Sequence, residues 1–305
     1  MKAQRHRVTE AQSKNQKKLV LGLPKGSLEE TTIRLFRKAG INLYGKSRSY
    51  YLACDDPELE IMLIRAQEIP LYVANAALDL GLTGKDWITE RGVKVKEVAE
   101  LCYAKSGLGR VRLVLAVPEE SDIRSVRDLQ GKRIATELVE VTKAYLKANQ
   151  VRAEVEFSWG ATEIKAGKLC DAITELTESG ATIRAHKLRI IDTIMVSTTR
   201  LIANPRSYQD SWKRRKIDYI SLLLQAALNA EELVGLKLNA SDRNLKKILS
   251  VLPSLNNPTI SALVRPGWHA IEVICRREQV TDMIPKLKEA GAEGIVEYLL
   301  NRVVY

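Results

Sequence analysis

The chain has 305 residues and a mass of 34.2 kDa, with 45% apolar and 28% charged residues. This composition excludes a disordered or fibrous chain, and the length suggests two or three globular domains. The sequence contains no run of 18 apolar residues and no apolar N-terminal core, so we expect neither a membrane span nor a secretion signal. The four cysteines, Cys54, Cys102, Cys170 and Cys275, form no C-x-x-C pair, which favours free thiols in the cytoplasm.

The net charge of +11 is unevenly distributed. Residues 1–18 carry six Lys or Arg and one Glu, which leaves +6 for the other 287 residues. We interpret residues 1–18 as a disordered basic tail and Lys213–Lys216 as a solvated helix face. A nucleic-acid partner is therefore not expected, whereas a protein that holds polyphosphates would also be basic.

The first two thirds of the chain alternate between strand and helix patterns. Residues 19–23 form an apolar strand, and Ser27 with Glu30 matches a capping box that starts a helix ending near Gly40. Further strands are predicted at 59–64, 78–83, 111–117, 132–136, 171–176 and 190–204, with helices at 69–77 and 139–148. This alternation predicts an α/β fold.

From about residue 225 the pattern is that of a small separate domain. Strands are predicted at 233–239, 259–264, 268–275 and 294–304, with Pro266-Gly267 as the turn of a hairpin. Leu245, Ile248, Leu249 and Leu252 share one helix face, and a second helix precedes Gly291. Because proline disfavours a helix interior, Pro285 suggests that this second helix starts late. The order β-α-β-β-α-β is ferredoxin-like and is typical of a regulatory ligand-binding module.

The strongest chemical signal is the segment 171–182, DAITELTESGAT. An acidic strand leads into a turn of small residues and then into a helix start, and consecutive N–H groups in such a turn bind phosphate oxygens. Thr177, Ser179 and Thr182 supply hydroxyl groups, and Gly180 permits close approach of the backbone. An ordinary capped turn remains the alternative, and Glu178 would repel a phosphate.

Basic residues occur at the ends of several strands. Lys25 follows the first strand, Arg65 follows 59–64, and Arg112 lies at the strand 111–117. In an open α/β sheet, ligands bind beyond the carboxyl ends of the strands, so Lys25 and Arg65 are placed to bind polyphosphate. Gly81–Asp86 lacks the spacing of a Walker loop, and three histidines give little support for a Ser-His-Asp mechanism.

Several separated segments together resemble ATP phosphoribosyltransferase in its long form, the family that catalyses the first step of histidine biosynthesis. The matching segments, which occur in order, are 23–28, 65–70, 79–86, 112–118, 131–136, 177–182, 257–259 and 291–295. Two segments depart from the family pattern. Residues 137–142 lack its aromatic-proline pair, and residues 159–165 (WGATEIK) lack its serine-containing string.

The resemblance implies a two-lobe catalytic core like that of periplasmic binding proteins, followed by an ACT-like regulatory domain. Lobe I would comprise 19–109 and 197–224, lobe II 110–196, and the regulatory domain 225–305. It further implies a homo-oligomer, dimer or hexamer, that L-histidine inhibits. We expect the histidine site near four residues, Asn239, Asn257, Thr259 and Gly294.

The implied reaction joins N1 of the adenine of ATP to C1 of phosphoribosyl pyrophosphate and releases pyrophosphate, with Mg²⁺ as cofactor. Thr177, Glu178, Ser179, Gly180, Ala181 and Thr182 would hold the 5′-phosphate. Asp171 and Glu175 would lie near the ribose hydroxyls or the metal, and Glu163 would orient a substrate. The cleft would be lined by Lys25, Gly26, Arg65 and Arg112. The resemblance does not assign the ligands of the metal.

Two other functions are compatible with a two-lobe fold. A non-catalytic sensor or binding protein would bind a small molecule without turnover, but the phosphate-binding segment argues against it. A LysR-like regulator needs an N-terminal helix-turn-helix, for which residues 1–18 are too short and too polar.

Overall fold

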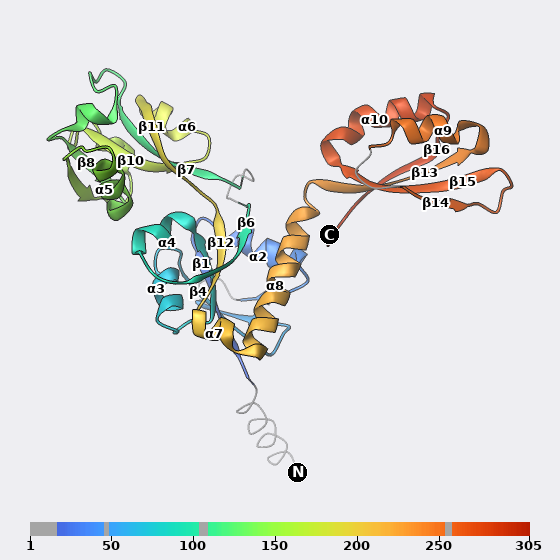
Figure 1. Ribbon diagram of the computed structural model, residues 1–305, viewed down its shortest axis with the longest axis horizontal. Coiled ribbons are helices and arrows are strands. Elements are labelled where there is room, and N and C mark those ends of the chain that lie inside the picture. The colour runs from blue at the N-terminus through green and yellow to red at the C-terminus, as the bar shows by residue number, and fades with distance from the viewer. Residues whose placement is uncertain (1–16, 46–48, 104–108, 254–257) are drawn as a thin grey trace, which may run out of the picture. The chain divides into compact units, whose positions relative to one another are not determined.

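The computed structural model describes residues 17–45, 49–103, 109–253 and 258–305. The chain divides into two compact units, the first ending at Ser221 and the second comprising Leu222–Tyr305 together with Lys38–Gly40. Figure 1 shows the first unit as two separate sheets with their helices, which we call lobe I and lobe II. Among the described residues, no helix is both long and apolar enough to cross a membrane.

Lobe I contains a mixed sheet in the order β2-β3-β4-β1-β5-β12-β6 within the described residues. Its strands are β1 (Leu19–Lys25), β2 (Leu43–Tyr44), β3 (Tyr51–Cys54), β4 (Leu59–Arg65), β5 (Leu80–Gly84), β6 (Lys96–Leu101) and β12 (Thr199–Ala203). Its helices are α2 (Glu29–Lys38), α3 (Ile69–Ala74), α4 (Lys85–Arg91) and α7 (Pro205–Gln209), with α8 (Ser211–Asn229) leading into the second unit.

Lobe II contains a second sheet in the order β11-β7-β10-β8-β9. Its strands are β7 (Val111–Pro118), β8 (Arg133–Thr136), β9 (Glu154–Phe157), β10 (Ala172–Thr177) and β11 (Leu188–Ser197). Its helices are η1 (Val126–Leu129), α5 (Val139–Ala148), η2 (Thr162–Ile164) and α6 (Ala181–Ala185). Strand β11 passes into β12 of lobe I across the single residue Thr198, which makes this segment one of the connections between the lobes (Figure 1).

The second unit contains a four-stranded antiparallel sheet in the order β14-β15-β13-β16 within the described residues. Its elements are β13 (Leu233–Ser241), α9 (Asp242–Val251), β14 (Thr259–Ala262), β15 (Trp268–Arg276), α10 (Arg277–Glu289) and β16 (Glu293–Leu299). The predicted β-α-β-β-α-β order is therefore confirmed, as is the α/β class of the whole chain. Alternate residues of β13, among them Leu236 and Leu238, are buried in one core together with residues of α9 and α10.

Two local expectations were wrong. Helix α10 begins at Arg277 and contains Pro285, because Val280 and Met283 are buried in the core and anchor the turns before the proline. Helix α2 begins at Glu29, so the proposed capping box of Ser27 and Glu30 does not form at this start. Glu29 instead accepts a hydrogen bond at Oε2 from the N–H of Gly26, at 3.3 Å.

Helix α5 of lobe II receives its N-terminal cap from lobe I. Its own preceding residue, Leu138, has no side chain that can accept a hydrogen bond. The two carboxylate oxygens of Glu90, on α4, accept hydrogen bonds from the N–H groups of Glu140 and Val141, at 3.1 and 3.0 Å. A carboxylate there satisfies two unpaired N–H groups and interacts favourably with the helix dipole. Glu90 therefore links the two lobes directly.

Replacing Glu90 by alanine should lower the free energy of unfolding by about 1 kcal/mol, the usual cost of losing a helix cap. Thermal and denaturant unfolding followed by circular dichroism would measure this loss. Glu120→Ala is the matched control, because Glu120 is exposed on a turn of lobe II. Equal stability of both variants would show that the cap contributes nothing.

Candidate active site

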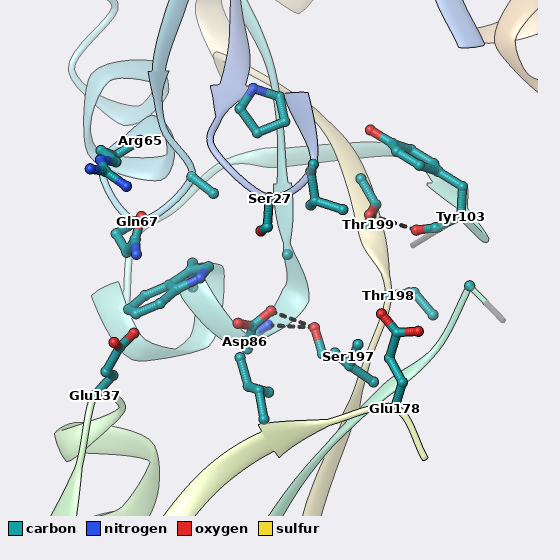
Figure 2. Close-up of a pocket in the computed structure, with 18 of the residues that line it drawn as sticks. Ser27, Arg65, Gln67, Asp86, Tyr103, Glu137, Glu178, Ser197, Thr198 and Thr199 are labelled. Atoms are coloured by element: carbon teal, nitrogen blue, oxygen red, sulfur yellow. Dashed lines mark hydrogen bonds between the residues drawn. The ribbon is translucent and has the colours of Figure 1, made fainter. Parts of the chain in front are cut away.

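A cavity of about 320 Å³ lies between lobes I and II, within the first unit (Figure 2). Most of its lining comes from the carboxyl ends of strands and from the segments that follow them, which is where α/β sheets bind ligands. The lining residues are Pro24, Lys25, Ser27, Leu28, Arg65, Ala66, Gln67, Gly84, Asp86, Trp87, Tyr103, Gly109, Val111, Glu137, Leu176, Glu178, Ser197, Thr198 and Thr199.

The lobe I wall carries two adjacent cations. Strands β1 and β4 pair in parallel with Lys25 opposite Arg65, so both side chains leave the sheet at the same edge. The ammonium of Lys25 lies 3.9 Å from the centre of the Tyr50 ring, which holds it by a cation–π contact. Gly26 has a φ of +109°, and a Cβ there would lie 3.7 Å from Nη1 of Arg65. Three predicted substrate-binding residues, Lys25, Gly26 and Arg65, are thus brought together.

The loop after β10, Thr177–Thr182, has its shape fixed by its own hydroxyl groups. Oγ1 of Thr177 accepts a hydrogen bond from the N–H of Gly180 at 2.8 Å, and Oγ of Ser179 accepts one from Ala181 at 3.3 Å. Gly180 has a φ of +74°, a conformation that glycine adopts without strain. Each hydroxyl hydrogen is left to donate, so the loop can present O–H groups to an anion although two of its N–H groups are used.

Arginines flank this loop. Nη1 of Arg184 donates to the carbonyl of Ser179 at 3.1 Å, and Arg112 pairs with Thr177 across β7 and β10. Arg112 does not line the cavity, whereas its neighbour Val111 does. The register therefore places Arg112 beside the loop rather than in the cavity wall.

Glu178 contributes a carboxylate to the cavity from the lobe II side (Figure 2). Its Oε2 is buried and has no hydrogen-bond partner among the described residues. A buried carboxylate oxygen without a partner is costly, which points to a ligand hydroxyl or cation as its partner. No group of three or more His, Cys, Asp or Glu in the described parts of the chain could hold a metal by itself.

Three carboxylates of lobe II interact beside the cavity. Burial, followed by the charges of Glu163 and Glu137, raises the pKa of Glu175 to about 7, and Thr162 donates a hydrogen bond to its carboxylate. Burial also raises the pKa of Glu137, which lines the cavity, while the nearby Lys165 opposes this rise. Because proximity of like charges disfavours ionisation, Glu175 can hold a proton near neutral pH. Glu175 and Glu163, both predicted site residues, are thus close together.

The structure separates Asp171 from this site. Asp171 lies just before the first residue of β10, whereas the loop begins at the last residue of β10, Thr177. The length of β10 therefore separates Asp171 from the loop. The Oδ2 of Asp171 accepts a hydrogen bond from the N–H of Arg133 at 2.8 Å, and Lys132 lies 4.0 Å from its Oδ1. The structure therefore does not bring Asp171 together with the loop, because a six-residue strand spans roughly 20 Å.

Asp86 and Ser197 are site residues that the sequence did not reveal. Ser197 Oγ donates to the carboxylate of Asp86 and accepts from its N–H at 3.0 Å, as Figure 2 shows. Burial raises the pKa of Asp86. The pair joins the start of α4 to the last residue of β11, next to the Thr198 connection. The position of Asp86 just after a buried strand was the one sequence signal that could have marked it as a site residue. Its partner Ser197 is 111 residues away in the sequence, so the pair itself could not be predicted.

In the second unit, three of the four predicted histidine-site residues fall on the sheet face opposite α9 and α10. Asn239 lies between the inward-facing Leu238 and Ala240, and a Cβ at Gly294 would lie 3.1 Å from its Nδ2. Thr259 pairs with Glu272, which in turn pairs with Lys237 of β13, so Thr259 shares this face. Asn257 lies outside the described residues.

Replacing Glu175 by glutamine should stabilise the protein above pH 7 and have little effect below pH 4.5. Between the ordinary pKa near 4.5 and the folded value of about 7, the folded state binds more protons, so wild-type stability falls as the pH rises. Removing the charge should recover on the order of 1–3 kcal/mol at pH 8. Melting temperatures from pH 4 to pH 9 test this, with the exposed Glu154→Gln as control. A Glu175→Gln effect independent of pH would contradict the assignment.

Comparisons with known proteins agree across the chain. The family model described as ATP phosphoribosyltransferase matches residues 65–226, and that of the family's C-terminal domain matches 230–302. The ATP phosphoribosyltransferase of Thermodesulfovibrio yellowstonii is 57% identical over 288 residues, 94% of this chain and 99% of that protein. That of Chlorobium luteolum is 55% identical, over 94% of this chain and 98% of that protein.

A solved structure gives the same family. A chain of the ATP phosphoribosyl transferase (HisG:HisZ) complex from Thermotoga maritima matches with a TM-score of 0.60 and 27% identity. The match covers 70% of this chain and 98% of that chain. The resemblance noted in the sequence is thus confirmed over nearly the whole length: the chain belongs to the ATP phosphoribosyltransferase family.

Proposed function

We propose that the cavity between lobes I and II is where this chain, as an ATP phosphoribosyltransferase of histidine biosynthesis, transfers the phosphoribosyl group. The reaction joins N1 of the adenine of ATP to C1 of phosphoribosyl pyrophosphate and releases pyrophosphate. One observation carries the assignment of the site. Two cations on adjacent strands of lobe I line one side of the cavity, and Glu178 of the hydroxyl-bearing loop lines its lobe II side, so anion-binding groups of both lobes lie at or next to one cavity.

The 5′-phosphate is assigned to the loop Thr177–Thr182. Thr177 and Ser179 hydroxyls donate to its oxygens, and Gly180 lets the backbone approach it closely. Arg112 and Arg184, which flank the loop, supply positive charge. The pyrophosphate is assigned to Lys25 and Arg65, whose charges stabilise the negative charge that develops as it departs.

Departure of pyrophosphate leaves an oxocarbenium-like C1, so correct placement of N1 matters more than a strong base. We assign Glu175 and Glu163 to the ribose hydroxyls. A protonated Glu175 can donate one hydrogen bond and accept another, and Thr162 keeps its carboxyl in place.

The residues fit a magnesium ion that arrives with the substrate. Mg²⁺ in phosphate sites is commonly held by one or two carboxylates together with substrate phosphates. Glu178 offers one such carboxylate, with its unpartnered buried Oε2. When bound, the ion neutralises pyrophosphate charge.

The second unit is assigned to feedback inhibition by L-histidine. Asn239 offers an amide beside Gly294, and Thr259 offers a hydroxyl on the same sheet face. We further propose that the chain forms a homo-oligomer, a dimer or hexamer, and that it acts in the cytoplasm, where its two phosphorylated substrates are available.

Pyrophosphate release by the full chain should require both ATP and phosphoribosyl pyrophosphate. Lys25→Met and Arg65→Met should each lower kcat/KM for phosphoribosyl pyrophosphate by about 100-fold or more, the usual cost of removing one group that stabilises developing charge. Lys147→Met is the control, because Lys147 is an exposed cation on α5. Binding of phosphoribosyl pyrophosphate without any turnover by the wild type would favour a sensor instead.

Asn239→Ala should raise the histidine concentration needed for half inhibition by about tenfold, as expected for the loss of one good hydrogen bond to a charged ligand. The uninhibited rate should stay unchanged, since Asn239 belongs to the second unit. Lys246→Ala, an exposed change on α9, serves as control. Unaltered inhibition in Asn239→Ala and in Gly294→Ala would place the histidine site elsewhere.

A further inference from the structure

A tryptophan stands exposed at the carboxyl edge of the lobe II sheet. Trp159 follows β9 by two residues and is 90% exposed. Its one aromatic neighbour in the described residues is Phe157, whose ring meets it edge to face at 4.8 Å and which is itself half exposed. A tryptophan offers one of the largest apolar surfaces of any side chain, so leaving it uncovered indicates a role in binding.

Hydrogen bonds tie the turn that carries Trp159 to β8 and η2. The N–H of Ser158 donates to the carbonyl of Thr136 at 2.8 Å, and Ser158 Oγ lies 3.0 Å from Thr162 Oγ1. Gly160 and Ala161 follow with φ values of +102° and +47°. A positive φ is unfavourable for alanine, and such conformations persist where the surroundings hold them and often at functional sites. The indole is therefore presented by a fixed and strained turn.

This turn adjoins the cavity. Strands β8, β9 and β10 run parallel, so Glu137, Trp159 and Glu178 all follow strand ends at the same edge of the sheet. A Cβ at Gly160 would lie 3.6 Å from Oε1 of Glu137, and Glu137 lines the cavity. The aromatic surface and a carboxylate acceptor therefore lie next to each other at the lobe II wall.

We propose that Trp159 is the stacking platform for the purine ring of ATP, an inference that rests on the proposed function. Stacking holds a base by its faces and leaves its edge free, which suits a reaction in which the ring nitrogen N1 is the nucleophile. The carboxylate of Glu137 is placed to accept a hydrogen bond from the exocyclic amino group. Trp159 is thus a substrate-positioning residue that acts on ATP and not on phosphoribosyl pyrophosphate.

The test compares steady-state kinetics of the full-length wild type with Trp159→Ala and Trp159→Phe. Loss of a stacking partner should raise KM for ATP about tenfold in Trp159→Ala and less in Trp159→Phe. KM for phosphoribosyl pyrophosphate should stay unchanged. Tyr219→Ala is the matched control, since Tyr219 is a 60% exposed aromatic on α8, outside the cavity lining.

A second readout does not depend on turnover. Titrating the wild type with ATP should quench tryptophan fluorescence, and the quenching should be weaker in Trp159→Phe, in which Trp87 of the cavity lining still emits. An unchanged KM for ATP in Trp159→Ala would overturn the proposal, as would the same quenching in wild type and Trp159→Phe. If Trp159→Ala altered the oligomeric state while KM for ATP stayed the same, the indole would contact a second copy instead. A wild type that quenched with ATP but released no pyrophosphate would refute the proposed function while supporting the platform.

Discussion

Two positive charges held side by side at the end of a parallel strand pair are the constraint on which the site depends. The register of β1 and β4 fixes Lys25 opposite Arg65, and it cannot shift by one residue without moving Leu19, Leu21 and Leu23, which are fully buried, to the opposite face of the sheet. The core of lobe I therefore holds together two cations that repel each other. A polyanion between them relieves this repulsion, so the burial of the strand also prepares the site for pyrophosphate.

Lobe II has the complementary arrangement. Its loop offers hydroxyl groups, and behind the loop Glu137, Glu163 and Glu175 are close enough to raise the pKa of Glu175. Two polar contacts join the lobes: the Glu90 cap on α5 and the pair of Asp86 with Ser197. They bring the cations of lobe I and the hydroxyl and carboxyl groups of lobe II to one cavity. Substrate positioning is thus set by a few polar contacts between lobes, whereas each lobe's shape is set by its own apolar core.

Local patterns sufficed to predict much of the fold. Apolar runs marked β1, β4 and β7, and the turn residues marked the loop after β10. No comparable local pattern marks β6 or α4. The position of β6 depends on its pairing with β12, and that of α4 on its contacts with β5 and α5.

Site residues were predictable where they follow a strand, as Lys25, Arg65 and the loop do. Asp171 lies apart from the loop because the strand predicted at 171–176 separates the two ends of the motif. Glu137, Asp86 and Ser197 could not be predicted, because their roles arise from contacts between distant segments.

The most direct test of the account is a crystal structure of the chain with phosphoribosyl pyrophosphate bound. We predict the 5′-phosphate within hydrogen-bond distance of the Ser179 and Thr177 hydroxyls, and the pyrophosphate against Lys25 and Arg65. A ligand bound with its phosphates away from both places, or at the Asp171 end of β10, would contradict the account.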